Sequence, residues 1–208
     1  MSLEPDRRDV RTTVTRVEAV DASSVKAFFD DVASDWDTMR LTYYDERVIE
    51  QLAERAELDA TQTVVDVGTG TGFVAAGLAS RAGLVIAVDN SRRMLDIART
   101  NLDRLDILNV DLREADLGAL PLPDASVDAA VANMVLHHAE DPAAMLGEMV
   151  RVTRPGGRVA VTDAVEHPYE WMRVEHADVW LGFAEAQVES LFGAARLVRY
   201  GYAPLGMQ

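Results

Sequence analysis

Short apolar runs alternate with helical stretches through the middle of the sequence. The runs are rich in β-branched residues and cover 62–67, 83–89, 106–112, 127–133 and 157–163. Stretches with helical spacing of apolar residues cover 73–82, 92–104 and 142–153. Strands that are apolar on both faces and alternate with helices are typical of a parallel sheet covered on both sides. We therefore expect an α/β fold with a doubly wound, mostly parallel sheet, whose ligands bind beyond the carboxyl ends of the strands.

The two ends of the sequence depart from this alternation. Residues 1–22 lack apolar periodicity, so we expect a loose arm there. Two helical segments follow at 23–39 and 43–58, before the first strand. The stretch at 195–206 is expected to form a sixth strand. We expect 23–208 to form a single domain, with a helical segment at 23–60 and a core at 61–164.

Composition excludes several classes of protein. The formal charge is −15, so nucleic acid and anionic membrane surfaces are poor partners. The sequence contains no cysteine, which removes disulfides, thiolate metal sites and cysteine nucleophiles. The first residues, MSLEPDRRDVRTTV, are too polar for a signal peptide, and no window is apolar enough to span a membrane. We expect a cytoplasmic protein.

A glycine-rich turn follows the first strand in TVVDVGTGTGF, residues 63–73. Gly68, Gly70 and Gly72 would let the backbone approach a ligand closely. The nicotinamide fingerprint requires a glycine where Phe73 stands. A carboxylate two residues before the first glycine, at Asp66, is poorly suited to a pyrophosphate but well suited to a cationic ligand. The turn therefore favours a ligand with an ammonium or a sulfonium group.

Acidic residues also follow the next two strands. Asp89 comes about 20 residues after the glycines, where an acidic side chain usually binds a ribose diol. Asp116 could accept a hydrogen bond from an adenine amino group, and the backbone amide of Leu117 could bind a ring nitrogen. S-adenosylmethionine is a ligand that has a cationic end, a ribose and a base.

Four motifs in this order resemble class I S-adenosylmethionine-dependent methyltransferases, in the branch similar to the ubiquinone and menaquinone biosynthesis methyltransferases. They are VVDVGTGTG, AVDNSRRMLDIAR, ADLGALPLPDASVDAAVANMVLHHAEDP and EMVRVTRPGGRVAVTD. The resemblance implies cofactor binding by Asp66, Gly68, Thr69, Gly70, Gly72, Asp89, Asn90, Met94, Asp116, Leu117 and Asn133. It also implies that the helices at 23–60 form a lid over the cofactor and that 165–208 covers the substrate. The usual closing antiparallel strand has no sequence after residue 208, so we expect either a longer chain or a homodimer.

Histidines are the candidate catalytic residues. His137 and His138 follow the fourth strand and His167 follows the fifth, so all three could border one pocket. Methyl transfer needs a base only if the acceptor must lose a proton, and His138 is our candidate for that role. We expect no metal site, because Asp163, His167 and their neighbours lack the spacing of motifs such as H-E-x-x-H.

The function expected from this sequence is S-adenosylmethionine-dependent methylation of a small apolar or aromatic acceptor at carbon or oxygen. Aromatic and soft side chains after the fifth strand would either cover the acceptor or pack as part of the core, namely Tyr169, Trp171, Met172, Trp180 and Phe183. This region is similar to methyltransferase domains associated with arsenic-type repressors, but a chain without cysteine lacks the thiolates that bind arsenite. Two alternatives stay open, a non-catalytic S-adenosylmethionine sensor and a nucleotide-cofactor oxidoreductase.

Overall fold

The computed structural model describes residues 21–199 and 201–205, and most of the expected arm at 1–22 lies outside them. The strands are β1 (Thr63–Val67), β2 (Leu84–Asp89), β3 (Val110–Glu114), β4 (Val127–Asn133) and β5 (Thr153–Thr162). The α-helices are α1 (Ala22–Val32), α2 (Trp36–Met39), α3 (Arg47–Arg55), α4 (Phe73–Leu78), α5 (Arg92–Arg104), α6 (Pro142–Val152), α7 (Met172–Glu175) and α8 (Glu185–Ala194), and the 3₁₀ helices are η1 (Arg40–Thr42) and η2 (Leu136–His138). The expected alternation of strands and helices is confirmed.

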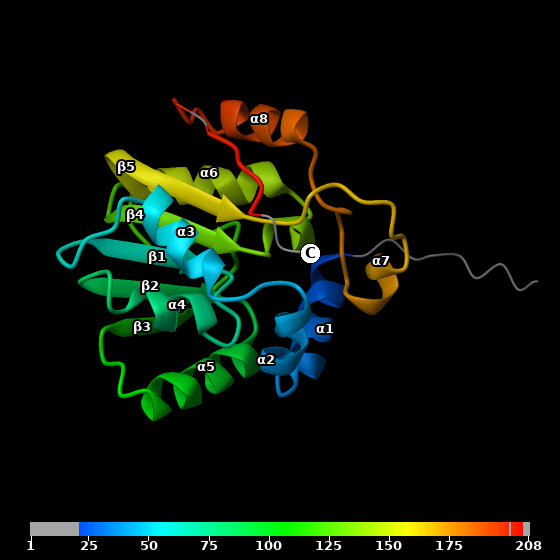
Figure 1. Ribbon diagram of the computed structural model, residues 1–208, viewed down its shortest axis with the longest axis horizontal. Helices are drawn as coiled ribbons and strands as arrows, with labels where there is room; N and C mark the ends of the chain where they lie inside the picture. Colours follow the sequence, from blue (N-terminus) through cyan, green and yellow to red (C-terminus); the bar gives the residue numbers. More distant parts are fainter. Residues whose placement is uncertain (1–20, 200, 206–208) are drawn as a thin grey trace, which may run out of the picture.

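The five strands form one sheet in the order β3-β2-β1-β4-β5, and each neighbouring pair is parallel. Val65 of β1 lies opposite Ile86 of β2 on one side and Ala130 of β4 on the other. The chain crosses from one half of the sheet to the other between β3 and β4, so the strand order reverses beside β1. Ligands of such sheets bind at this point, outside the carboxyl ends of the strands. Figure 1 shows these ends as the arrowheads.

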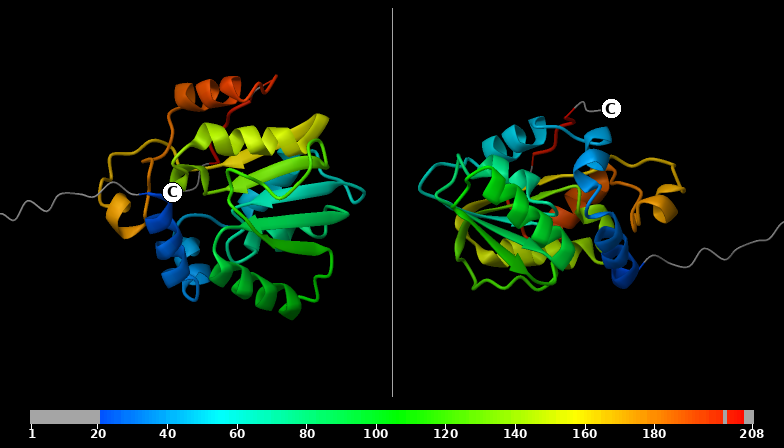
Figure 2. Two further views of the ribbon diagram at one scale, coloured as in Figure 1. Left: turned by 180° about the vertical axis from the view of Figure 1, so that it is seen from behind. Right: turned by 90° about the horizontal axis from the view of Figure 1, so that it is seen from below.

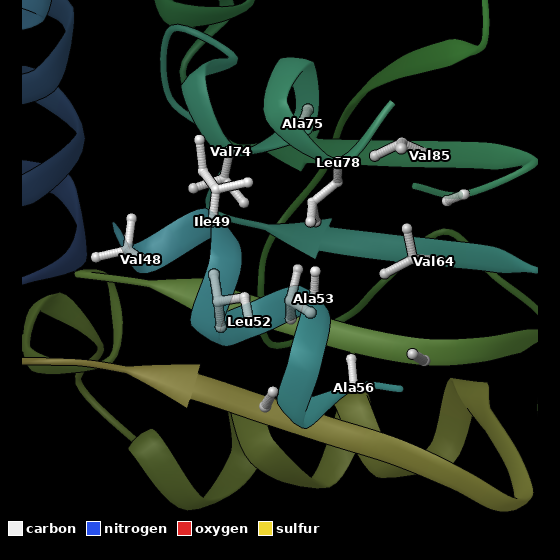
Figure 3. Close-up of a cluster of buried hydrophobic side chains, with 14 of the residues drawn as sticks. Val48, Ile49, Leu52, Ala53, Ala56, Val64, Val74, Ala75, Leu78 and Val85 are labelled. Carbon is white, nitrogen blue, oxygen red and sulfur yellow. The ribbon is translucent and has the colours of Figure 1, made fainter. Parts of the chain in front are cut away.

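Helices cover both faces of the sheet, so β1 is buried on both sides. On one face Val64 packs with Leu52 of α3 and Leu78 of α4 (Figure 3). On the other face Val65 and Val67 belong to a cluster with apolar residues of α6, and residues of α8 pack against its edge. Successive side chains of a strand point to opposite faces, which is why an unbroken apolar run is required here.

Two strands differ from their expected bounds. The run at 106–112 was expected as a strand, but β3 begins only at Val110 because Asp106 takes a left-handed φ of 54° that ends the preceding helix. Strand β5 begins earlier than expected, at Thr153, and its pairing with β4 shifts register between Val127 and Ala129. Gly156, with φ of 84°, lies in the irregular part of β5.

The sixth strand expected at 195–206 is wrong for the part of this stretch that the structure describes. Residues 195–199 and 201–205 contain no strand. After α8 the backbone is left-handed at Arg196 and Arg199, with φ of 60° and 71°. These two conformations interrupt an extended chain. Leu205 nevertheless packs against the core on the α3 side. Among the described strands β5 is therefore an edge, and the homodimer stays a prediction.

Of the helices before β1, α1 and α2 lie at the carboxyl ends of the strands, where a lid is expected, whereas α3, which was also expected in the lid, packs on a face of the sheet. Figures 1 and 2 show α1 and α2 there, with α7 on the same side of the sheet. Helix α1 begins with a capping box in which the Asp21 side chain accepts a hydrogen bond from the Ser24 amide at 2.9 Å. No helix among the described residues is long and apolar enough to cross a membrane.

Candidate active site

A cleft of about 280 Å³ opens at the carboxyl ends of the strands, beneath the lid. Ten of the residues expected from the sequence line it: Gly68, Thr69, Gly70, Asp89, Asn90, Met94, Asp116, Leu117, Asn133 and His138. Asp66 and Gly72 are not part of its lining. The motifs that are separated in the sequence therefore meet at one place.

The glycine-rich turn after β1 has a backbone that only glycine adopts easily. Gly68 has φ of 75°, and a Cβ atom added there would lie 2.4 Å from Cγ2 of Val135. The amide of Gly70 donates a 2.7 Å hydrogen bond to Oδ2 of Asp89. The turn thus lies directly beside the end of β2, and its backbone forms part of the cleft wall.

Asp66 lies behind this turn. It is 1% exposed, and the Thr69 hydroxyl donates a 2.7 Å hydrogen bond to its Oδ2. Burial raises the pKa of the Asp66 carboxyl to about 7, with a further contribution from the nearby Asp89 charge. Thr69 lines the cleft and stands between it and Asp66. Asp66 therefore influences the cleft through the turn rather than as part of its wall.

Asp89 is the acidic residue that faces the cleft from β2. It is 8% exposed, and its two oxygens accept hydrogen bonds from the backbone amides of Gly70 and Ser91 at 2.7 and 2.9 Å. Burial raises the pKa of its carboxyl, whereas these amide hydrogen bonds lower it. Each carboxylate oxygen has a second acceptor site, so Asp89 can receive two hydroxyl groups from a ligand.

Residues after β3 and at the end of β4 complete the wall of the cleft. Asp116 is exposed, and its Oδ1 accepts a 2.7 Å hydrogen bond from the Gly118 amide, which shapes the loop that carries Leu117. Asn133 ends β4, and its Oδ1 accepts a 2.7 Å hydrogen bond from the Thr162 hydroxyl. Met94 is 1% exposed and forms an apolar part of the wall.

The lid contributes aromatic side chains that were not named from the sequence as site residues. Phe29, Trp36 and Tyr44 line the cleft. Acidic lid residues hold the lid in place: Asp30 accepts a hydrogen bond from the Ser91 hydroxyl at 2.5 Å, and Asp37 accepts one from the Thr71 hydroxyl at 2.7 Å. The acidic and aromatic residues of FFDDVASDWD are thus the signal that marks the lid.

The two adjacent histidines of η2 occupy different environments. Nδ1 of His137 lies 2.6 Å from Oδ1 of Asp163. Burial lowers the pKa of His137, but the charge and hydrogen bond of Asp163, with Asp178, outweigh it and leave that pKa raised. Nδ1 of His138 lies 3.1 Å from the Ala177 carbonyl oxygen, and burial holds the pKa of His138 well below 6.5. The pKa values of these two neighbouring imidazoles are therefore shifted in opposite directions.

A second, smaller cavity of about 30 Å³ adjoins the cleft. His137 and His138 line it, whereas His167 lines neither space, so the expectation that all three border one pocket is wrong. Asp178 also lines this cavity and was not identified from the sequence. Of the expected aromatic and soft cluster after β5, only Met172 reaches either space. Ligand atoms of His137, His138 and Asp178 lie within 4.8 Å of one another, so these three residues could hold a metal ion.

A parallel sheet with a glycine-rich turn after β1 and a buried acidic residue at the end of β2 defines an α/β domain that binds a nucleoside cofactor. Residues 65–161 match a family model described as a methyltransferase domain. The chain carries a class I S-adenosylmethionine-dependent methyltransferase domain, and the resemblance found in the sequence is confirmed.

Particular relatives support this assignment. An arsenite methyltransferase of Halobacterium salinarum is 39% identical over 108 residues, which is 50% of this chain and 28% of that protein. A demethylmenaquinone methyltransferase of Clavibacter sepedonicus is 32% identical over 152 residues, 72% of this chain and 61% of that protein. The crystal structure of an S-adenosylmethionine-dependent methyltransferase from Aquifex aeolicus superposes with a TM-score of 0.63, at 25% identity, over 88% of this chain and 90% of that one. The chain thus spans less than two thirds of both curated relatives.

Proposed function

We propose that the protein transfers a methyl group from S-adenosylmethionine to a small acceptor with an apolar or aromatic body, at carbon or oxygen. The observation that carries this proposal is the convergence of a glycine turn and acidic residues from successive strand ends on one cleft beneath an aromatic lid. When bound, S-adenosylmethionine supplies an electrophilic methyl group on a sulfonium.

The residues of the cleft would hold this cofactor in one orientation. Asp66 would attract the cationic amino acid end across the turn formed by Gly68, Thr69, Gly70 and Gly72.

The nucleoside end would be held by residues at the ends of the following strands. Asp89 would receive the ribose hydroxyls, with Asn90 beside it. Asp116 and Leu117 would recognise the adenine, Met94 would pack against it, and Asn133 would line the middle of the cleft. The lid would exclude water, which favours displacement at the methyl carbon, with the sulfonium sulfur leaving as a neutral thioether.

His138 is the residue that we propose as a general base. A carbonyl oxygen only accepts hydrogen bonds, so the contact with Ala177 assigns the proton of the neutral imidazole to Nδ1 and leaves a lone pair on Nε2. The low pKa of His138 keeps it neutral near pH 7. Such a base would take the proton that a hydroxyl or ring carbon loses on methylation.

The His138→Gln variant is expected to lower kcat by roughly 10² to 10⁴, the usual contribution of a general base, without a comparable loss of cofactor affinity. The measurement is turnover with an acceptor found by screening phenolic and quinone-like compounds with methyl-labelled donor. His167→Gln serves as the matched control, because His167 lines neither cavity. An unchanged kcat for His138→Gln would remove the base from the mechanism.

A calorimetric titration with S-adenosylhomocysteine tests the function directly, with NADH as the control ligand. We expect binding of the former and none of the latter, because Phe73 stands where a nicotinamide site requires glycine. Binding of NADH alone would overturn the proposal in favour of an oxidoreductase.

The affinity for S-adenosylhomocysteine is expected to rise as the pH rises from 5.5 to 7. Asp66 must ionise to attract the ligand's ammonium group, and its pKa in the free protein is about 7. Below that value each pH unit costs up to about tenfold in affinity. The Asp66→Asn variant is expected to bind roughly tenfold more weakly at pH 7 and to lose this dependence. Calorimetry at both pH values measures both effects, and a wild-type affinity that does not change with pH would contradict this role of Asp66.

A further inference from the structure

The smaller cavity lies where an acceptor would meet the cofactor. It shares Trp36, Tyr44, Met134 and His138 with the cofactor cleft, so these residues separate the two spaces. His138, the proposed base, thus borders both. A group bound in the smaller cavity is therefore placed next to the residue that would receive its proton.

A buried carboxylate without a hydrogen-bond partner points to the ligand of this cavity. Asp178 is 2% exposed, and within the described part of the chain its Oδ1 accepts no hydrogen bond. Nε2 of His137 lies 3.7 Å from this oxygen and Nδ1 of His138 lies 3.9 Å from it. Both distances exceed those of a hydrogen bond. A buried acceptor left unpaired costs about 1 to 3 kcal/mol, and more when it is charged, so a donor placed there is strongly favoured.

The backbone holds Asp178 in this position. The amides of Val179 and Trp180 donate hydrogen bonds of 3.0 and 2.9 Å to the carbonyl oxygen of His137. The segment that carries Asp178 is therefore attached to η2, which keeps the Asp178 backbone beside His137 and His138.

The other walls of the cavity are aromatic and come from the lid. Phe28, Trp36, Tyr43 and Tyr44 of the lid line the cavity. The Tyr43 hydroxyl lies 3.1 Å from Nε2 of His176, which follows α7 and also lines the cavity. At about 30 Å³ the cavity accommodates a group the size of an amine or a hydroxyl, and displacement of the lid would admit a ring behind it. Aromatic faces beside a carboxylate also suit a cationic nitrogen.

We propose that Asp178 selects the methyl acceptor, and that the acceptor carries an amino or hydroxyl group that donates a hydrogen bond to its Oδ1. This inference rests on the proposed methyltransferase function and specifies its substrate class. An aromatic compound of the same shape without a donor leaves Asp178 unpaired, and sites built to hydrogen-bond a substrate reject such analogues strongly. Asp178 is thus a specificity residue, while His138 acts on the proton.

The experiment uses isosteric pairs of probes on the full chain saturated with S-adenosylhomocysteine. Phenol is compared with toluene and benzylamine with ethylbenzene, and binding is measured by ligand-observed NMR. We expect each donor to bind at least roughly tenfold more tightly than its isostere, and Asp178→Asn and Asp178→Ala to lose this preference. The phenol and benzylamine arms distinguish a hydroxyl from an ammonium group as the hydrogen-bond donor to Asp178.

Controls separate this proposal from the proposed function and from loss of folding. The Asp178 variants should retain wild-type S-adenosylhomocysteine affinity, and Asp103→Asn, an exposed aspartate on α5, should change neither measurement. Failure of the wild type to bind S-adenosylhomocysteine would refute the proposed function itself. Equal binding of isosteres, or no binding of any probe to the loaded protein, would overturn the role of Asp178. Zn²⁺ binding to chelator-treated protein that is lost in Asp178→Asn would also overturn it, by making Asp178 a metal ligand with His137 and His138.

Discussion

Replacement of Asp89 by alanine is expected to weaken S-adenosylhomocysteine binding by about a hundredfold. The two ribose hydroxyls would lose their acceptors, and charge-assisted hydrogen bonds contribute about 1.5 to 3 kcal/mol each. The same substitution removes the acceptors for the amides of Gly70 and Ser91, so the glycine-rich turn also loses its attachment to β2. Calorimetric titration at pH 7 measures the loss.

A second variant separates these two effects of Asp89. Asp89→Asn keeps one acceptor oxygen for a backbone amide but removes the charge, so we expect an intermediate affinity together with near-normal thermal stability. Asp103→Ala is the matched control, because it removes an exposed aspartate from α5. If Asp89→Ala binds within threefold of the wild type, then Asp89 does not hold the ribose, and the orientation proposed for the cofactor has to be abandoned.

The parts of the fold that the sequence predicted well are those with strong periodic patterns. Helix α5 and strand β4 have the expected bounds, 92–104 and 127–133, because a regular pattern continues to each end and stops at a residue with a clear local role. Ser91, for example, caps α5 by accepting a hydrogen bond from the Met94 amide. The glycine turn was equally recognisable, since positive φ values at Gly68, Gly70 and Gly72 require that residue type.

The expectations that failed have a common physical cause. Where the local sequence pattern is weak, tertiary contacts decide which conformation the chain adopts. The β-branched and aromatic residues near the C-terminus indicated a strand, yet no described strand lies there to pair with β5, and the left-handed residues Arg196 and Arg199 interrupt extension. Asp178 could not be identified at all. It lies on an irregular segment about 40 residues after His138, and backbone hydrogen bonds to His137 bring it to the site.

The Asp163→Ala variant is expected to lower the free energy of unfolding by about 3 to 5 kcal/mol, the usual cost of removing one partner of a buried ion pair. Asp163 is central to the junction of β5 and η2. Its Oδ1 lies 2.6 Å from Nδ1 of His137, and its Oδ2 accepts a 2.8 Å hydrogen bond from the Leu136 amide. The loss leaves a buried imidazole and a backbone amide without their acceptor. Urea denaturation of both proteins measures the difference.

The pH dependence of the loss of stability in Asp163→Ala tests whether the charge on His137 is the source of that loss. The folded state raises the pKa of His137 above 6.5, so the pair stabilises the protein fully below the unfolded value and progressively less as the pH rises through the folded pKa. The cost of Asp163→Ala should therefore be largest below pH 6.5 and should fall as the pH rises through the folded pKa of His137. In a double-mutant cycle with His137→Ala, the two substitutions should be strongly non-additive. Additive losses that do not vary with pH would show that Asp163 stabilises only the backbone of η2, and that His137 is neutral beside the proposed base.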